Sequence, residues 1–446
     1  MKIKIEHGMI LSLDKENQIL KDGVLCIDGD KIVYVGSGSM DGFIPDKVID
    51  AKGCIVMPGL VNAHCHSPMT MFRNFAGGLP LHVWMFERIR PLQQYVTKED
   101  IESCARLAYA EMIKSGTVAF AEMYAWADVL GELTSETGLK ALIAGSYGKD
   151  QGLAGVTDKH RILEHGQKIR EKSRGRVKEG LLLHSLYALP EKTICETVQL
   201  ALEADMRLQI HVSETKTEIN ECHEKYQMTP VAKLARLGVF DVPAIAAHCV
   251  YLEEEDFEIL KQHQVNVAHC PVSNLKLGSG IADIHQIMDS GINVCLGTDG
   301  AASNNNLNLF QEANMAALLA KGIRLDPTVL PAETILRIAA ENGYQALGIE
   351  NSGQLEAGKN ADLIIVSMDG PHFTPLTDPY DALIYAAQAS DVIMTMVDGK
   401  ILMENRELKT IDEEKVLSDA KQTAQKILSN SSAFDRTVTI LNNYYC

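Results

Sequence analysis

The chain has 446 residues, of which 46% are hydrophobic and 23% are charged. It is therefore long enough and apolar enough to bury at least one large core, which excludes intrinsic disorder and fibrous architectures. Lys and Arg number 42 and Asp and Glu number 59, which gives a formal net charge of −17. Because that charge repels phosphate backbones and anionic membranes, we expect a small-molecule substrate and neither a nucleic acid nor a membrane as partner.

The cysteines and the N-terminal segment predict a cytoplasmic protein. Ten cysteines are scattered along the chain without a CxxC pair, which is typical of reduced thiols rather than of a secreted disulfide scaffold. The opening MKIKIEHGMILSLD carries charges among its apolar residues and alternates like a strand, so it lacks the apolar run of a signal peptide. No segment approaches the roughly 18 uncharged apolar residues that a membrane span needs.

Short strands separated by turns fill about the first 55 residues, and the pattern then changes to apolar runs alternating with helical stretches such as 98–115, 191–204 and 253–263. This alternation is typical of β/α units around a parallel sheet. The apolar runs are eight: 55–64, 117–124, 140–147, 180–187, 208–213, 244–249, 265–270 and 293–299. After a helical stretch around 304–348, the β pattern returns in GQLEAGKNADLIIVSMDG and VIMTMVDGKILMENREL.

We therefore predict an α/β fold, a (β/α)8 TIM-type barrel with a small discontinuous β-sandwich domain built from both termini. The predicted boundaries are 1–57 for the N-terminal part of the β domain, 58–350 for the barrel, 351–410 for the C-terminal part of the β domain, and 411–446 for a terminal helix and tail.

Histidines and one aspartate lie at the ends of the predicted barrel strands. His64 and His66 form an H-x-H pair whose side chains point to the same side of a strand. His211 ends the fifth run, His248 the sixth and Asp299 the eighth. Barrel enzymes build their active sites at these C-terminal strand ends. Five such residues are unlikely to fall at strand ends by chance, so we interpret them as one site.

The set His64, His66, His211 and Asp299 suits one divalent cation of zinc type with an open position for water. Imidazole and carboxylate also accept Fe²⁺, so spacing does not choose between the two metals. His248 is the surplus group, either a further ligand or, as we favour, a hydrogen-bonding partner of the bound water or the substrate oxygen. His269 is expected to pack near the seventh strand.

Glu214 lies three residues after His211 and therefore on the loop above the predicted metal. A carboxylate in this position takes a proton from water and passes it to a leaving group. Glu214 and His248 are thus predicted catalytic residues.

Five motifs resemble the amidohydrolase superfamily, and within it the branch of methylthioadenosine / S-adenosylhomocysteine deaminases. They are PGLVNAHCHSPM at 58–69, HVSET at 211–215, AHCV at 247–250, AHCPVSNLKLGSG at 268–280 and GTDGAASNNN at 297–306. The resemblance covers about residues 1 to 405. It implies a mononuclear metal, zinc or iron, and a hydrolytic deaminase that converts an aminopurine nucleoside to its oxo form with release of ammonia. It also implies a catalytic role for Asp299, together with Glu214 and His248.

The resemblance also implies substrate-binding residues. Trp84 matches a pocket tryptophan, Arg161 one of two family arginines, His184 the substrate histidine of the fourth strand, and Ser303 a serine four residues after Asp299. Glu214 is shared with catalysis. Gln93 stands where the family has a glutamate that binds the ribose hydroxyls, and an amide holds a vicinal diol less well because it offers one acceptor.

Other functions stay open at this point. The alternative substrates are another heterocyclic amine, such as a free aminopurine, 5′-deoxyadenosine or a pterin, and a triazine in a chlorohydrolase reaction. A non-catalytic scaffold on the same fold is expected to have lost metal ligands, and none is lost here. Relatives of this branch often form dimers or tetramers, so a homo-oligomer is possible.

Overall fold

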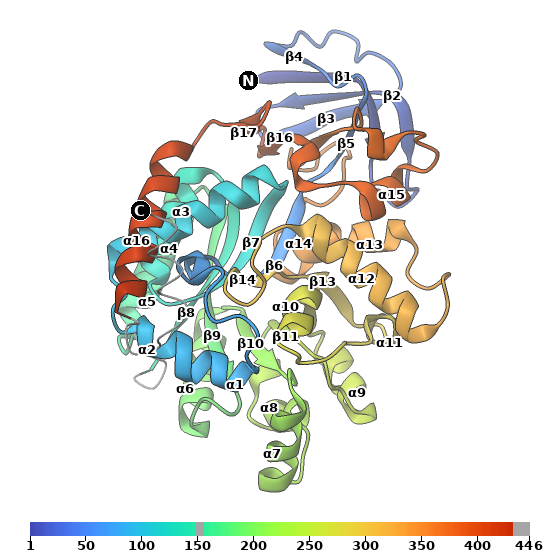
Figure 1. Ribbon diagram of the computed structural model, residues 1–446. Helices are drawn as coiled ribbons and strands as arrows, with labels where there is room; N and C mark the ends of the chain where they lie inside the picture. The colour runs from blue at the N-terminus through green and yellow to red at the C-terminus, as the bar shows by residue number, and fades with distance from the viewer. Residues whose placement is uncertain (149–155, 431–446) are drawn as a thin grey trace.

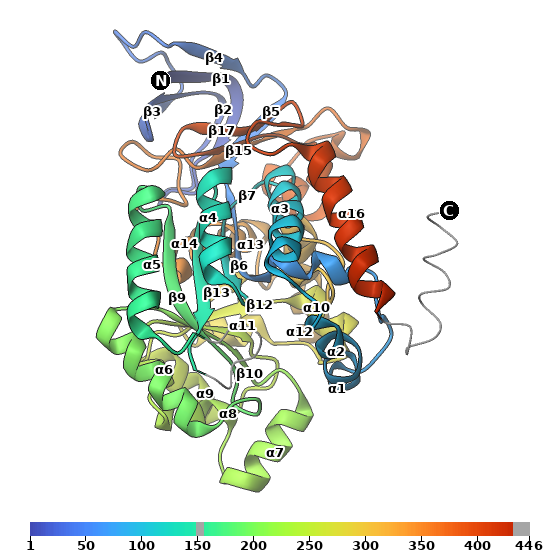
Figure 2. The same cartoon turned by 90° about the vertical axis from the view of Figure 1, so that its left-hand side faces the viewer.

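The computed structural model describes residues 1–148 and 156–430 (Figures 1 and 2). Residues 149–155 lie outside the described part, as does the segment 431–446 of the predicted tail. Within the described part, no helix combines the length and the apolar composition that crossing a membrane takes.

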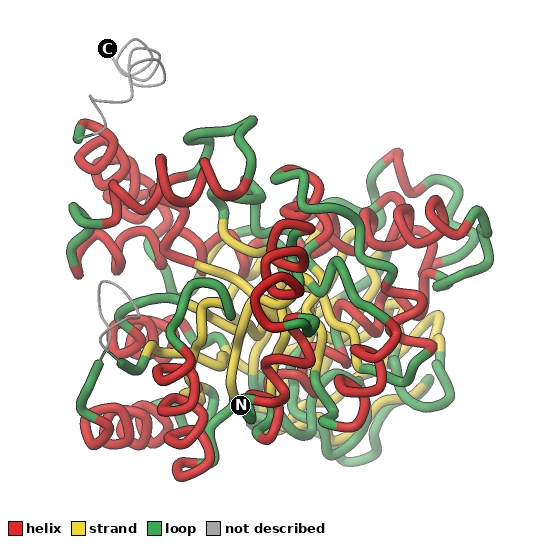
Figure 3. Tube along the Cα trace, turned by 90° about the horizontal axis from the view of Figure 1, so that it is seen from below, coloured by secondary structure: helices red, strands yellow, loops and turns green. Residues whose placement is uncertain are grey.

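A closed barrel of parallel strands forms the centre of the molecule. Its order is β13-β12-β11-β10-β9-β8-β7-β6-β14, and β14 follows β13 after two residues, so its pairing with β6 closes the ring. Figure 3 shows the strands gathered in the middle with helices around them. The strands are β6 (Leu60–His66), β7 (Thr117–Met123), β8 (Lys140–Ser146), β9 (Val177–Ser185), β10 (Leu208–Val212), β11 (Ala244–His248), β12 (Asn266–His269), β13 (Asn293–Leu296) and β14 (Asp299–Gly300).

Helices connect the barrel strands on the outside. They are η1 (Ser67–Phe72), α1 (Leu81–Val83), π-helical η2 (Trp84–Ile89), α2 (Arg90–Gln93), α3 (Lys98–Lys114), α4 (Ala127–Thr137), α5 (Lys159–Lys172), α6 (Glu191–Ala204), α7 (Lys216–Tyr226), α8 (Pro230–Arg236), η3 (Val239–Asp241), α9 (Glu254–Gln262), α10 (Pro271–Lys276), α11 (Ile284–Asp289), α12 (Leu309–Arg324), α13 (Ala332–Ala339) and α14 (Glu341–Leu347). The helices predicted at 98–115, 191–204 and 253–263 are confirmed as α3, α6 and α9.

Local sequence explains where these elements form. The residues of β7 are buried throughout, as expected for a parallel strand with the barrel core on one face and helices on the other. Thr97 and Asp100 form a reciprocal capping box that starts α3. Thr229 caps α8, and Pro230 occupies its first turn, where the missing N–H has no intrahelical acceptor to lose.

A second, mixed sheet is built from both ends of the chain and lies at the end of the barrel where its strands begin (Figures 1 and 2). Its order is β18-β17-β16-β15-β5-β1-β2-β3, with β4 paired to β1. Its elements are β1 (Lys2–Leu11), β2 (Ile19–Asp28), β3 (Lys31–Gly36), β4 (Lys47–Asp50), β5 (Cys54–Pro58), β15 (Leu363–Ser367), η4 (Pro371–Phe373), α15 (Pro379–Asp381), η5 (Ala382–Ala386), η6 (Ala389–Asp391), β16 (Val392–Val397), β17 (Lys400–Glu404) and β18 (Glu407–Leu408). The predicted fold class is thereby confirmed.

The apolar run at 55–64 contains two strands rather than one. β5 pairs with β1 and β15 in the terminal sheet, whereas β6 belongs to the barrel. Gly59 separates them, and a Cβ there would lie 2.4 Å from the side chain of Val118. The run looked continuous in the sequence because all of its residues, 55–64, are buried. The predicted domain boundaries at 57, 350 and 410 stay predictions.

The C-terminal helix α16 (Glu413–Ser429) packs along α3, where Lys426 Nζ lies 2.8 Å from the buried carboxylate of Asp100. The terminal sheet is tied to the barrel by Lys140 at the start of β8, whose Nζ lies 2.6 Å from both Asp362 and Asp398. These contacts leave the opposite end of the barrel, where the strands finish, to the loops that carry the predicted site.

Candidate active site

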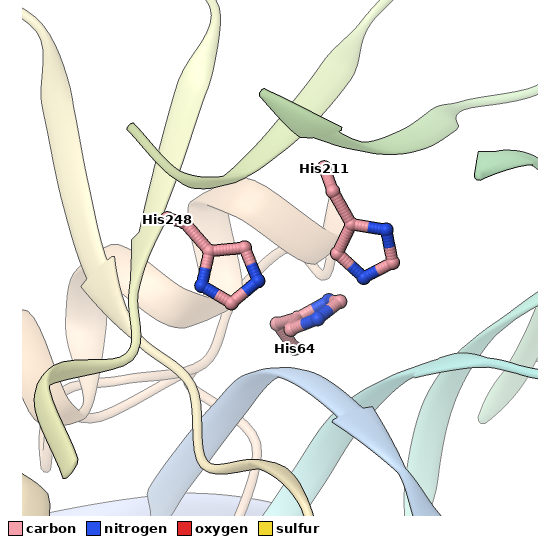
Figure 4. A group of neighbouring side chains, drawn as sticks. All are labelled: His64, His211 and His248. Carbon is pink, nitrogen blue, oxygen red and sulfur yellow. The ribbon is translucent and has the colours of Figure 1, made fainter. Parts of the chain in front are cut away.

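The predicted metal ligands converge at the C-terminal ends of the barrel strands. His64 and His66 come from β6, His211 from β10 and Asp299 from β14. Asp299 Oδ1 lies 3.2 Å from His66 Nε2 and 3.7 Å from His64 Nε2, and the Nε2 atoms of His66 and His211 are 3.3 Å apart. Figure 4 shows His64 and His211 turned toward one another, with His248 beside them.

Backbone carbonyls orient two of these imidazoles. His66 Nδ1 lies 2.5 Å from the carbonyl oxygen of Met123, and His211 Nδ1 lies 2.7 Å from that of His184. A carbonyl only accepts a hydrogen bond, so Nδ1 carries a proton in each ring and Nε2 faces the cluster. This is the arrangement found around metal-binding histidines.

The burial and protonation of these side chains fit the binding of a divalent cation. Both ring nitrogens of His64 are buried without a hydrogen-bond partner, which is a costly state unless something binds there. Burial lowers the pKa of His64 and of His211 well below the ordinary value, so both rings are neutral, as metal ligation requires. Although burial favours the neutral acid, the hydrogen bond and charge of His66 bring the pKa of Asp299 well below its usual range. A cation would take the place of the proton that His66 shares with Asp299, and three neutral imidazoles with one carboxylate then form a donor set of zinc type.

Two serines hold the carboxylate of Asp299. Its Oδ2 accepts hydrogen bonds from Ser273 Oγ at 2.5 Å and Ser303 Oγ at 2.7 Å, which leaves Oδ1 facing the histidines. The sequence predicted Ser303 as a substrate-binding residue, a role that stays a prediction, and it missed Ser273. Ser273 follows a predicted strand end in AHCPVSN, and this position was the one feature of the sequence that could have indicated a role at the site.

Glu214 and His248 lie next to the cluster. Glu214 Oε2 is 3.9 Å from His248 Nε2, and Glu214 Oε1 accepts a hydrogen bond from Ser279 Oγ at 3.1 Å. His248 Nδ1 lies 2.8 Å from Asn274 Oδ1, which directs its Nε2 toward Glu214. Burial raises the pKa of Glu214, so this carboxyl is suited both to take up and to release a proton.

Of the predicted substrate residues, His184 lies beside this centre and Gln93 is linked to it through Tyr124. His184 ends β9, and its ring centroid lies 4.9 Å from that of His211. Trp84 is buried in η2, and Gln93 at the end of α2 donates from Nε2 to the hydroxyl of Tyr124 at 3.2 Å. The ring of Tyr124 lies 6.4 Å from that of His66, which joins Gln93 to the site through one side chain.

Arg161 lies elsewhere, so the structure does not bring it to the histidines. Its side chain on α5 is 68% exposed and lies 3.6 Å from Asp128 on α4. The arginine near the site is Arg90 on α2, which the sequence missed: burial, and then the positive charges of His66 and Arg90, lower the pKa of His184 to about 4.

Buried carboxylates behind the site were also missed. Glu122 in β7 accepts the backbone N–H of Ser67 with both oxygens at 3.1 Å, and burial raises its pKa to about 7. Glu312 in α12 accepts from Asn304 Nδ2 at 2.6 Å and from the N–H of Val272 at 3.2 Å, so it joins the start of α10 to the loop that follows β14. A glutamate within the apolar run TVAFAEMY was the one signal available for Glu122.

Glu312 is expected to make stability fall as the pH rises. Burial raises its pKa from 4.5 to about 8, so between these values the folded protein holds a proton that the unfolded chain has released. The free energy of unfolding therefore decreases through this window and the contribution is flat above it. In Glu312→Gln, the loss of melting temperature between pH 5 and pH 8 should be smaller than in the wild type. The exposed Glu224→Gln variant is the control, and identical pH slopes in all three proteins would contradict the prediction.

Comparison with known proteins gives a consistent result. Residues 55–402 match the model of the amidohydrolase family. A 5-methylthioadenosine/S-adenosylhomocysteine deaminase of Acetivibrio thermocellus is 44% identical over 431 residues, which cover 96% of this chain and 100% of the relative. A 5′-deoxyadenosine deaminase of Methanococcoides burtonii is 40% identical, with coverages of 97% and 99%.

Two solved structures extend the likeness to the fold. An adenosine deaminase of Xanthomonas campestris with bound zinc has a TM-score of 0.91 and 33% identity, covering 96% of this chain and 98% of its own. The atrazine chlorohydrolase of Arthrobacter aurescens TC1 complexed with zinc has a TM-score of 0.84 and 25% identity, with coverages of 95% and 100%. The similarity therefore spans the terminal sheet as well as the barrel.

Proposed function

The chain belongs to the amidohydrolase family, and from that premise we propose that it is a metal-dependent hydrolytic deaminase of 5′-methylthioadenosine and S-adenosylhomocysteine. One observation carries the reaction: Glu214 and His248 face each other at 3.9 Å beside a cluster of three imidazoles and one carboxylate. The substrate class is supported by the full-length similarity to deaminases of that name.

His64, His66, His211 and Asp299 would hold the cation, and Zn²⁺ is favoured because the structural relatives contain zinc. A divalent cation would supply Lewis-acid chemistry, which lowers the pKa of a water molecule towards about 7. Fe²⁺ accepts the same donors.

Glu214 moves the protons in the proposed reaction. It takes one proton from the water that attacks the amine-bearing ring carbon and passes it to the neighbouring ring nitrogen. It then takes the second proton from the same oxygen and passes it to the departing amine. Water and the aminopurine thus yield the oxopurine and ammonia. The raised pKa of Glu214 supports this role, because a higher pKa makes the carboxylate a stronger base toward the water proton.

His248 and Asp299 orient the reactants in this proposal. His248 is fixed by Asn274, so its Nε2 is available to hydrogen-bond the attacking oxygen. Asp299 is fixed by the hydroxyls of Ser273 and Ser303 and keeps one oxygen toward the centre. Held groups need no reorganisation during the reaction, which is the main electrostatic advantage of an enzyme site.

Substrate binding is proposed for Trp84, Gln93, His184 and Ser303. His184 has a pKa of about 4 and is therefore neutral, so it either donates or accepts a hydrogen bond according to its tautomer. Gln93 uses its amide nitrogen on Tyr124, which leaves one carbonyl oxygen as acceptor for the ribose. 5′-Deoxyadenosine, which carries the same 2′,3′-diol, is a second candidate substrate, supported by the similarity to the Methanococcoides burtonii deaminase.

Ammonia release from zinc-loaded protein tests the function. The panel contains methylthioadenosine, S-adenosylhomocysteine, 5′-deoxyadenosine, adenosine, guanine, a pterin and cytosine, with wild type and Gln93→Glu compared on each. We expect the highest kcat/KM for the two thio-nucleosides, and a further gain of about tenfold in Gln93→Glu, because a hydrogen bond to a charged group contributes about 1.5–3 kcal/mol. A 2′-deoxyribose analogue, which lacks the diol, should show no such gain. If only another amine is turned over, the proposed substrate is wrong. If no amine releases ammonia, the proposed function is wrong.

A cytoplasmic location and assembly into homo-oligomers, both expected from the sequence, stay predictions. On location, the structure shows only that none of the described helices is suited to cross a membrane.

A further inference from the structure

The segment that carries Glu214 leaves the barrel in a turn whose backbone N–H groups need partners. Ser213 follows β10 with a φ of +51°, in the left-handed region. Its carbonyl oxygen accepts the N–H groups of Val250 and Tyr251, both at 3.0 Å, so the loop after β11 holds the segment on that side. On the other side, the N–H groups of Ser213 and Glu214 point to a different element.

Glu218 receives both of these N–H groups. Its Oε1 accepts from Ser213 N at 3.2 Å and its Oε2 from Glu214 N at 2.8 Å, one donor to each oxygen. Glu218 lies in the first turn of α7, and its own N–H donates to the capping hydroxyl of Thr215 at 3.2 Å. The carboxylate is therefore fixed by the start of a helix, whose dipole favours a negative charge there.

This carboxylate is kept in an unfavourable place. Glu218 is 5% exposed, and burial raises its pKa to about 7, with the nearby charge of Glu214 acting in the same direction. Burying two carboxyl groups four residues apart lowers the free energy of unfolding. A neutral side chain in place of Glu218 would avoid this cost. Such a group beside a candidate active site is more often explained by the geometry it imposes than by stability.

The side chain of Glu214 is held separately. Ser279, on the loop after α10, donates to Glu214 Oε1 at 3.1 Å. Glu218 therefore fixes the backbone and Ser279 fixes the carboxylate, and the two constraints together set the direction in which Glu214 presents its second oxygen to His248.

We propose that Glu218 is a positioning residue for the proposed deaminase, which aims Glu214 by holding the backbone N–H groups of Ser213 and Glu214. The inference rests on the proposed role of Glu214. Glu218 touches none of the predicted metal ligands, so it acts through Glu214 and leaves the metal in place.

Glu218→Gln is the test variant, measured as the full-length, zinc-loaded protein. The amide has one oxygen for two N–H donors and turns its NH₂ group against one of them. We expect kcat to fall about 10²-fold, the cost of a small misplacement of a reacting group, with KM and zinc content unchanged. In a Glu214→Gln background, the same change should cost little more.

Asp100→Asn is the matched control. Asp100 is also buried and also accepts a backbone N–H at the start of a helix, that of Thr97 at 2.9 Å, but it lies at α3. We expect it to lower the melting temperature while kcat per folded enzyme is kept.

Amide hydrogen exchange of the peptide covering residues 212–218 gives a readout that needs no substrate. Exchange of this peptide should accelerate at least about tenfold in Glu218→Gln and stay at the wild-type rate in Asp100→Asn, since a lost hydrogen bond of about 1.4 kcal/mol corresponds to tenfold. If wild type deaminates nothing, the proposed function is wrong and accelerated exchange still supports the role of Glu218 in fixing the segment. Unchanged exchange, or unchanged kcat in an active enzyme, would overturn the positioning role.

Discussion

Replacing Glu214 by Gln is expected to lower kcat by about 10³-fold while zinc content stays at the wild-type level. A positioned acid–base group contributes about 10²–10⁴-fold, and the amide neither accepts nor returns a proton at any working pH. The variant keeps the size of the side chain and an oxygen that accepts from Ser279. Steady-state ammonia release and metal analysis on the same preparation measure the two quantities.

Glu224→Gln is the control for this experiment. Glu224 lies on α7, ten residues further along the chain, and is exposed, so its loss should leave kcat unchanged. Since an amide needs no ionisation in a buried site, Glu214→Gln should also unfold no more easily than the wild type. Full activity of the Glu214→Gln enzyme would contradict the proposed mechanism, whatever the substrate.

Removal of the metal is expected to abolish ammonia release and to lower the melting temperature. A cation that binds only the folded protein stabilises it by about 4 kcal/mol at a free concentration of 1,000 times its dissociation constant. Without it, His64 keeps two buried ring nitrogens that have no hydrogen-bond partner. Dialysis against a chelator, followed by addition of Zn²⁺ or Fe²⁺, measures both effects and identifies the metal that restores activity.

A pair of histidine variants makes the metal prediction specific. His64→Asn should purify with little metal, whereas His269→Asn should purify with the full amount. His269 is a good match because it also ends a barrel strand, is also buried and also has an unpaired Nδ1, but it belongs to neither group of candidate metal ligands in the described part of the chain. Equal metal content in the two variants, or turnover by the metal-free protein, would refute the assignment.

The position of the proposed metal ligands was predictable because it follows from a rule of the fold. In a parallel barrel all strands end at the same face, so polar residues that end separate strands meet there. His64 and His211 are 147 positions apart in the numbering, yet their ring centroids are 5.0 Å apart. Alternation along the strand was enough to place His66 beside His64.

The contacts that orient these residues were not predictable in the same way. Ser273 and Asp299 are 26 residues apart, and Ser279 and Glu214 are 65 apart. Their approach depends on the path of each loop beyond its strand, and nothing in a serine or an asparagine reveals its partner. The same reason explains Arg161: one turn of helix decides whether an arginine faces solvent or the site, and here it faces solvent.

The sequence alone determined the α/β class, the eight-fold barrel flanked by strands from both ends, and the residues that end the strands. Hydrophobic periodicity and strand-end chemistry are local properties, and the parallel topology converts them into a shared site. Only the tertiary structure decided that the run at 55–64 divides at Gly59 between two sheets, and that Glu122, Glu218 and Glu312 are buried behind the site. A buried carboxylate and a solvated one look alike in a sequence, because burial is the product of every element that packs around the group.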